Sequence, residues 1–583
     1  MDKQPFSKKA LYFLGQPSCL ALVYFTVMSI IMTYPLITKM GTAALGGGGG
    51  DGTYFIWLVG WVQKALFQLR IYPFFARYMN YPQGWNLATT DITPAMVAIA
   101  MPGSLLFGPT WGFNFAMLLS FILSGWAMYL WVKHLTGDPI AGLVAGTVFA
   151  FLPYRMVHFA VGHLSLAGTQ WFPFYFWGLF DLLKQEKFSW KPVLMAGIAA
   201  GLIGLTSPYY VYMTGLITVV FLLGFILFKG FIRLKQAVFW KSLLAFGVLA
   251  VLLVGFSMIP YLTLNSENGL VSTRSVEYLN RYSASPTDFV IPSIKQFLWG
   301  NWIDTTFSPE VFQESTLYIG AVAFVLAVIA WFKRRQLRYP ELLGIAILVA
   351  AAGFVLALGI QLHWLGSTRL PQALQTVFHR KDMPYFYLPS YYLYQYLPFF
   401  SKMRVMMRFG LFTLIFTSLM AGLGAYLLTK SASQNVRRWV GLGLLVLVFI
   451  DFYPGILKGF SPTHARPVDA WLATQPNTGT LAQFPFDEES SQAQVYNTLV
   501  NQKPFLGGYF SSYGPEQYTR IAPVMNKFPS QESVDLLRQL GVSYVVVDSS
   551  RYRNFSIIDE KIRSFGLGLL QVSATEYVYG LSK

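Results

Sequence analysis

The sequence predicts an α-helical polytopic membrane protein with about eleven transmembrane helices, interfacial helices on its outer face and a small α/β extracytoplasmic C-terminal domain. Of the 583 residues, 54% are hydrophobic and only 12% are charged, whereas a soluble protein carries roughly 25% charged residues. The mean hydropathy is +0.47, and long apolar runs alternate with short polar connections. These features exclude a soluble enzyme, a disordered scaffold and a disulfide-rich secreted module.

The expected membrane spans come from the apolar runs, because a spanning helix needs about 20 mainly apolar residues. Eleven runs qualify, the third being short: 18–38, 112–132, 139–153, 165–183, 191–206, 208–228, 240–262, 316–332, 342–360, 409–428 and 439–457. The first run follows Lys8 and Lys9 without a small-residue cleavage site. We therefore expect it to be retained as a helix and not removed as a signal peptide.

The orientation follows from the basic residues, which gather in every second short connection. The positive-inside rule then places the N-terminus in the cytoplasm. We expect the protein to lie in the inner (plasma) membrane of the cell. The longer loops 39–111, 154–164, 263–315 and 361–408 and the polar tail fall outside. Residues 94–108 are apolar but too short to span and contain Pro102-Gly103, so we expect a re-entrant or interfacial helix there.

The chain is thus expected to divide into a transmembrane module, residues 1–458, and a soluble extracytoplasmic α/β domain, residues 459–583. In the tail, TLAQFPF, SYVVVDSS and EYVYGL predict strands, and SQESVDLLRQLGV predicts an amphipathic helix that ends at Gly541. No catalytic motif is recognisable in the tail. The single Cys19 excludes an internal disulfide. The net charge of +17 is spread in short clusters, which favours membrane lipids over nucleic acid as the partner.

Two outer carboxylates are the first candidates for chemistry. Asp51 follows five glycines, GGGGGDGTYFIW, just after the first span, and Asp91 precedes the predicted re-entrant stretch. Asp51 is either a solvated loop residue or a carboxylate held at the membrane surface as a general base or metal ligand. Residues 53–67 predict an aromatic amphipathic helix that lies in the membrane interface. The glycine run is not a nucleotide-binding loop, because no Gly-Lys-Ser/Thr follows it.

The second outer loop, PYRMVHFAVGH, contains Arg155, His158 and His163. These residues either snorkel at a helix end or hold a phosphate at the depth of the lipid headgroups. The spacing of five between the two histidines does not place them on one face of a helix. We therefore assign no metal site from the sequence, although a need for a divalent metal stays open.

Basic and aromatic residues mark the later outer segments. Arg404 and Arg408, in SKMRVMMRF, are one helical turn apart at the outer end of a predicted span. This position opposes the usual charge bias, so we expect an anionic partner, either the phosphate of a substrate or an ordinary lipid headgroup. Tyr209 and Tyr210 are either interface anchors or a wall that contacts a sugar. Arg274 is either a solvated loop residue or a further substrate contact.

With GDGTYFIW, PYRMVHFAVGH and SKMRVMMRF in this many-span arrangement, the chain resembles the GT-C superfamily of polytopic glycosyltransferases. That family has an acidic residue in its first outer loop, interfacial helices after the first span and often a soluble outer C-terminal domain. Asp51 is followed by Gly and not by the Glu of protein-O-mannosyltransferases, and the Trp-Trp-Asp motif of oligosaccharyltransferases is absent. The subfamily is therefore not identified, and transfer to protein asparagine is disfavoured.

The resemblance implies a polyprenyl-phosphate-linked monosaccharide as donor, a glycan or glycolipid as acceptor, and direct displacement at the anomeric carbon, which inverts it. It also implies that Asp51 takes the proton of the acceptor hydroxyl. The donor phosphate would be bound by Arg404, Arg408 and Arg155. Further substrate contacts would come from Asp91, His158, His163, Tyr209, Tyr210 and Arg274.

Three other functions stay open. A lipid-linked glycan flippase or transporter needs ionisable residues deep in its spans, and the runs 316–332, 342–360 and 409–428 contain none. A polysaccharide polymerase or ligase would place its essential residues in loops 263–315 or 361–408 and leave Asp51 dispensable. A non-catalytic assembly platform would tolerate every polar change in the outer loops. The absence of charges in those spans favours a one-sided enzyme over a transporter.

Overall fold

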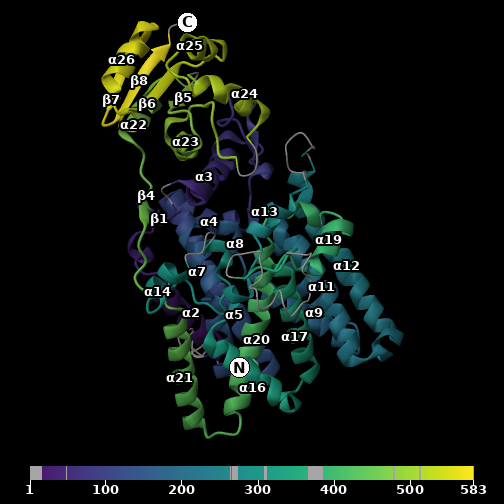
Figure 1. Cartoon of the computed structure of the whole chain (residues 1–583). Coiled ribbons are helices and arrows are strands. Elements are labelled where there is room, and N and C mark those ends of the chain that lie inside the picture. Colours follow the sequence, from purple (N-terminus) through teal and green to yellow (C-terminus); the bar gives the residue numbers. More distant parts are fainter. Residues whose placement is uncertain are drawn as a thin grey trace, which may run out of the picture.

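The structure is a computed structural model of the whole chain, and Figure 1 shows its course from the N-terminal to the C-terminal end. It describes residues 16–46, 49–262, 264, 273–307, 312–364, 385–476, 479–510 and 514–581. Residues 1–15, with Lys8 and Lys9, lie outside the described residues, as do parts of the predicted outer loops 263–315 and 361–408.

Each predicted apolar run coincides with a helix. These helices are α2 (Pro17–Met32), α5 (Pro109–Thr136), α6 (Pro139–Ala150), α9 (Trp171–Lys184), α10 (Trp190–Thr206), α11 (Pro208–Lys229), α12 (Ala237–Met258), α16 (Ala321–Phe332), α17 (Pro340–Ala357), α20 (Gly410–Thr429) and α21 (Gln434–Phe452). Among the described residues, five helical segments are long and apolar enough to cross a membrane: those containing α5, α11, α12, α17 and α20. A sixth is α6 with α7 (Pro153–Ala160), if this pair, bent by 41°, counts as one span. The helices are confirmed, while the number of crossings and their orientation stay predictions.

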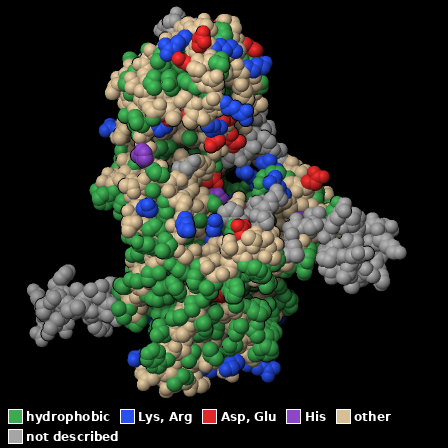
Figure 2. All heavy atoms as spheres, turned by 60° about the vertical axis from the view of Figure 1, so that its left-hand side comes forward, with side chains coloured by type: hydrophobic (Ala, Val, Ile, Leu, Met, Phe, Trp, Pro, Cys, Tyr) green, Lys and Arg blue, Asp and Glu red, His purple; other side chains and the backbone are tan. Residues whose placement is uncertain are grey.

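Small residues let these helices pack closely around α20, which is buried along most of its length. A Cβ atom added at Gly424 would lie 1.9 Å from the carbonyl oxygen of Leu326 in α16, and one added at Gly146 would lie 2.4 Å from that of Gly125. Glycine at such contacts allows backbones to approach as they do in membrane helix bundles. Figure 2 shows hydrophobic side chains over the surface of this helical part, with Lys and Arg side chains at its lower edge.

The aromatic helix predicted at residues 53–67 is α3 (Gly50–Lys64), and its predicted amphipathic character is wrong, while its position relative to the membrane stays a prediction. Every residue from Gly52 to Val62 is buried, because α3 packs against α4 (Pro94–Phe107), α5 and the tail helix α23 (Glu488–Asn501). Figure 1 shows α3 between the tail and the helical part. A helix covered on all sides needs no polar face. The apolar stretch with Pro102 forms α4, one helix of 14 residues through the proline.

The tail contains a four-stranded sheet near the C-terminus, as predicted. Its strands β5 (Leu481–Phe484), β6 (Tyr544–Asp548), β8 (Glu576–Leu581) and β7 (Leu567–Ser573) lie in the order β5-β6-β8-β7. Strands β5 and β6 are parallel, and the other two pairs are antiparallel. The three predicted strands are confirmed, and β7 is an additional edge strand. The predicted helix is α25 (Gln531–Gln539), and Gly541 follows it at a φ of +69°.

The tail also contains α22 (Pro467–Thr474), α24 (Glu516–Met525) and α26 (Phe555–Ser564). It begins beside a short antiparallel pair, β4 (Phe460–Pro462) with β1 (Ala43–Leu45), that joins it to the first outer loop. The boundary after residue 458 stays a prediction. The outer connections of the helical part contain β2 (Phe75–Ala76), β3 (Trp85–Asn86), α8 (Leu164–Ala167), α13 (Val276–Arg281), α14 (Gly300–Phe307), α15 (Phe312–Ser315) and α19 (Ser390–Tyr396).

Candidate active site

A cavity of about 300 Å³ lies where connections that we predict to be extracytoplasmic meet the tail. Six of the residues predicted from the sequence line it together: Asp51, Asp91, His163, Tyr209, Arg404 and Arg408. Other polar groups on its wall are Tyr54, Ser165, Tyr278, Glu314, Glu488, Gln492 and Tyr509. The carboxylates and the guanidinium groups that the sequence singled out therefore share one cavity.

Asp51 is placed by a close meeting of three glycine backbones. A Cβ atom at Gly52 would lie 2.3 Å from the carbonyl oxygen of Gly46, and one at Gly162 would lie 2.5 Å from the Cα atom of Gly52. Gly46 and Gly162 also have φ values of +66° and +78°. These contacts hold the first turn of α3 against the turn that carries His163. The amino-terminal end of a helix also favours a carboxylate such as Asp51.

Both carboxylate oxygens of Asp51 have hydrogen-bond partners. Its Oδ2 atom is 2.6 Å from Nε2 of His163, and the Tyr509 hydroxyl donates to Oδ1. Burial alone would raise the pKa of Asp51, but His163, Tyr509 and the charge of Arg408 outweigh it and hold the pKa at about 2. The side chain is 37% exposed, so an ionised carboxylate faces the cavity.

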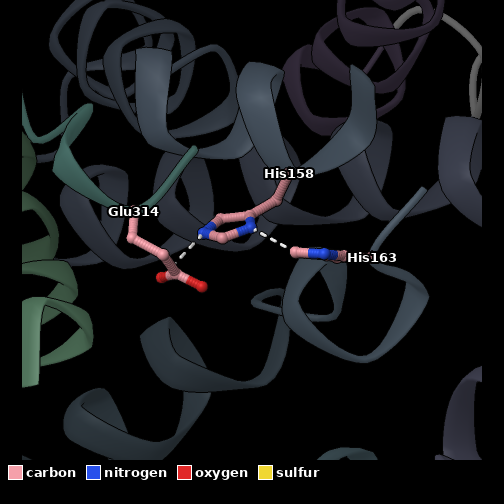
Figure 3. A group of neighbouring side chains, drawn as sticks. All are labelled: His158, His163 and Glu314. Atoms are coloured by element: carbon pink, nitrogen blue, oxygen red, sulfur yellow. Dashed lines mark hydrogen bonds and ion pairs between the residues drawn. The ribbon is translucent and has the colours of Figure 1, made fainter. Parts of the chain in front are cut away.

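From His163, one hydrogen bond and one charge contact lead into the protein interior, as Figure 3 shows. Nδ1 of His163 is 2.8 Å from Nδ1 of His158, and Nε2 of His158 is 3.8 Å from Oε2 of Glu314. The argument from spacing against a shared site was wrong, because α7 ends at Ala160 and the turn at Gly162 brings His163 back against His158.

His158, His163 and Glu314, here called the imidazole–carboxylate triad, each offer a ligand atom, and these atoms lie within 4.8 Å of one another. Nε2 of His158 is buried and has no hydrogen-bond partner among the described residues. Two imidazoles and a carboxylate are ligands that divalent transition metals accept in proteins. The triad therefore fits a divalent cation, and the metal question that the sequence left open has a defined location.

Glu314, in α15, was not predicted, and it forms a buried ion pair with Arg408 in the cavity wall. It accepts from Nε of Arg408 at 3.2 Å and from Nη2 at 2.6 Å, a bidentate pair. Burial would raise the pKa of Glu314, but the charges of Arg408 and His158 lower it to about 2. The only sequence signal was an acidic residue just before an apolar run.

The second guanidinium, that of Arg404, lines the cavity beside aromatic rings. Its Nε atom is 3.4 Å from the hydroxyl of Tyr278, whose ring lies 5.2 Å from the guanidinium of Arg274. Arg274 itself does not line the cavity. The guanidinium of Arg408 lies 5.0 Å from the ring of Tyr209. The cationic wall therefore carries aromatic faces of the kind on which sugars and cations stack.

Asp91 has an environment opposite to that of Asp51. Burial raises its pKa to about 6, although a hydrogen bond from Ser165 opposes the change, and the charge of Asp51 raises it further. The Tyr54 hydroxyl donates to the Asp91 carbonyl oxygen at 2.6 Å. Two carboxyl groups with pKa values moved apart in one cavity are typical of sites that handle protons.

Of the predicted site residues, four do not line the cavity: His158 and Arg274, described above, and Arg155 and Tyr210. Arg155 is fully buried and donates to the carbonyl oxygens of Ala150 and Ala167, at 2.5 and 3.3 Å. Tyr210 is buried and donates to the carbonyl oxygen of Leu166 at 2.8 Å. Neither lines the cavity. Because both side chains are buried away from the cavity, we leave both out of the proposed site.

A protein-family model described as a domain of unknown function, DUF6311, matches residues 23–380. The chain belongs to this family. No curated protein matches it. The DUF6311 chain is similar to the arabinofuranosyltransferase AftD from Mycobacteria, with a TM-score of 0.56 and 14% identity over 97% of this chain and 41% of that one.

The DUF6311 chain is also similar to the oligosaccharyltransferase of Archaeoglobus fulgidus in its apo form. The TM-score is 0.51 at 12% identity, over 92% of this chain and 70% of that one. Identities this low show the fold alone. The DUF6311 chain has the GT-C fold that its sequence motifs resemble, and its subfamily is unresolved.

Proposed function

We propose that this protein is a membrane-embedded glycosyltransferase that moves a monosaccharide from a polyprenyl-phosphate donor to an acceptor hydroxyl on the extracytoplasmic face. One observation carries the proposal: in a GT-C fold, an ionised carboxylate and two guanidinium groups line a single cavity of about 300 Å³. Transfer of a sugar from a glycosyl phosphate needs a group that takes the proton of the acceptor hydroxyl, and it needs groups that stabilise the departing phosphate.

The donor phosphate is assigned to the wall formed by Arg404 and Arg408. Guanidinium groups bind phosphate oxygens through charge-assisted hydrogen bonds. Glu314 binds Nε and Nη2 of Arg408 and so fixes the orientation of this side chain before a donor arrives. The adjacent rings of Tyr209 and Tyr278 are placed to contact the sugar of the donor.

The acceptor is assigned to the wall that carries Asp51. The acceptor oxygen forms a bond to the anomeric carbon while the bond from that carbon to the donor phosphate oxygen breaks, and the electron pair stays with the phosphate. Asp51 takes the hydroxyl proton, and Arg404 and Arg408 stabilise the charge on the departing phosphate. Because the pKa of Asp51 is about 2, it stays ionised at neutral pH and accepts the proton as the hydroxyl becomes acidic in the transition state.

A divalent cation, if bound, would be held by the imidazole–carboxylate triad and would supply a Lewis acid beside Asp51. The chemistry assigned above to Asp51 and to the two arginines belongs to the chain itself.

The test is turnover of a radiolabelled polyprenyl-phosphate sugar by the purified protein in lipid nanodiscs, with identification of the product. We expect Asp51→Asn to lower the rate by about 10²–10⁴-fold and Arg404→Ala to weaken the use of the donor. Asp304, exposed in α14, and Lys402, close to Arg404, do not line the cavity. Asp304→Asn and Lys402→Ala are therefore matched controls with expected wild-type rates. Unchanged rates in both site variants would remove the proposed roles.

A further inference from the structure

The tail reaches into the cavity at the turn that carries Asp51. Glu488 and Gln492 of α23, together with Tyr509, belong to the cavity wall. Oε1 of Gln492 accepts a hydrogen bond from the backbone N–H of Gly50 at 3.2 Å. The catalytic carboxylate proposed above is therefore held from two sides, by the helical part through His163 and by the tail.

The ring and the backbone of Tyr509 are each held by a contact, and the residue is buried. Its ring stacks on that of Tyr54 with centroids 4.9 Å apart and an angle of 19° between the rings. Its carbonyl oxygen accepts from the Thr90 hydroxyl at 3.2 Å, and the residue is 8% exposed. With the ring and the backbone held in this way, the Tyr509 hydroxyl donates a hydrogen bond to Oδ1 of Asp51. The two oxygens of Asp51 thus each have a separate donor, Tyr509 on Oδ1 and His163 on Oδ2.

We propose that Tyr509 is a positioning residue that fixes the Asp51 carboxylate in its reactive orientation, so that the C-terminal domain is part of the catalytic centre. This inference rests on the function proposed above for Asp51. A hydrogen bond to one oxygen leaves the carboxylate free to rotate about its Cβ–Cγ bond, whereas a donor on each oxygen sets its plane. Precise placement of a reacting group changes rates strongly, because a shift of about 1 Å can cost about 10²-fold.

The first test needs no substrate. Thermal unfolding of wild type, Tyr509→Phe, Asp51→Ala and the double variant in the same nanodiscs measures whether the two side chains act together. Because the Tyr509 hydroxyl donates to Asp51, Tyr509→Phe is expected to lower the melting temperature in the wild-type background and by a smaller amount in the Asp51→Ala background.

Tyr496→Phe is the matched control, because the Tyr496 hydroxyl donates within the tail, to the carbonyl oxygen of Thr463 at 2.6 Å, and Tyr496 does not line the cavity. We expect Tyr496→Phe to change the melting temperature equally in the wild-type and Asp51→Ala backgrounds. An equal change for Tyr509→Phe in the two backgrounds overturns the proposal, because the two side chains would then act independently.

The second test uses turnover of the radiolabelled polyprenyl-phosphate sugar. Tyr509→Phe is expected to lower kcat about tenfold or more with little change in the KM for the donor, because the donor phosphate is assigned to the opposite wall. A change in KM alone contradicts a role in positioning Asp51. Absence of turnover by the wild-type protein would refute the proposed function, whereas the unfolding cycle still decides whether the Tyr509 hydroxyl holds Asp51.

Discussion

The ion pair between Arg408 and Glu314 gives a prediction whose size follows from its burial. The side chains are 13% and 4% exposed, and two hydrogen bonds join them. Removing one partner of such a pair leaves a buried charge without its counter-charge, at a cost of about 3–5 kcal/mol. We expect Glu314→Gln and Arg408→Gln each to cost about 3 kcal/mol, because glutamine keeps part of the hydrogen bonding.

The double variant removes both charges, so its cost should fall about 2–3 kcal/mol short of the sum of the single costs. Thermal unfolding of the wild-type, single and double variants in the same nanodiscs completes the cycle. The control pair is Arg551 with Asp487, 2.9 Å apart but 36% and 37% exposed, for which the coupling should stay below about 1 kcal/mol. Additive effects at Arg408 and Glu314 would refute the reasoning.

The remaining predictions concern backbone packing, pH and metal. Gly52→Ala places a Cβ atom 2.3 Å from a carbonyl oxygen, so turnover should fall about 10²-fold, whereas Gly247→Ala, which meets no atom within 4 Å, should keep the wild-type rate. Burial raises the pKa of Asp91 from 3.8 to about 6. The protonated Asp91 therefore contributes folding stability that is fully present below about pH 4 and is lost as the pH rises through 6. Melting temperatures across this window should fall in wild type and change less in Asp91→Asn; parallel curves would contradict this. Calorimetric titration with Zn²⁺ should find one saturable site that is lost when either imidazole of the triad is replaced, and binding that survives both changes would contradict the triad.

The sequence predicted the helices well, because apolar length and turn residues are local properties. It failed at α3, where the aromatic side chains suggested an amphipathic helix with one exposed face. The sequence does not show that the tail covers this helix. Trp57 donates a hydrogen bond to Thr498 in the tail at 3.0 Å, and the two residues are 441 positions apart. Burial on every face is a property of the assembled chain, and no periodicity within residues 53–67 reveals it.

The candidate site shows the same contrast between local sequence properties and contacts between distant residues. Asp51, Arg404 and Arg408 stood out because charged residues at the ends of apolar runs are unusual. Glu314 and Tyr509 were missed, because their importance lies in contacts with Arg408 and Asp51 that span 94 and 458 positions. The sequence therefore identified the groups with unusual charge but not the partners that fix them.

The central claim is that Asp51 accepts a proton from an acceptor hydroxyl during transfer of a sugar from a polyprenyl phosphate bound by Arg404 and Arg408. Single-turnover transfer and donor affinity, measured on the same nanodisc samples of wild type and Asp51→Asn, test it most directly. The account predicts nearly equal affinity for the donor and a transfer rate lower by about 10²–10⁴-fold in the variant. Equal transfer rates in the two proteins would contradict it.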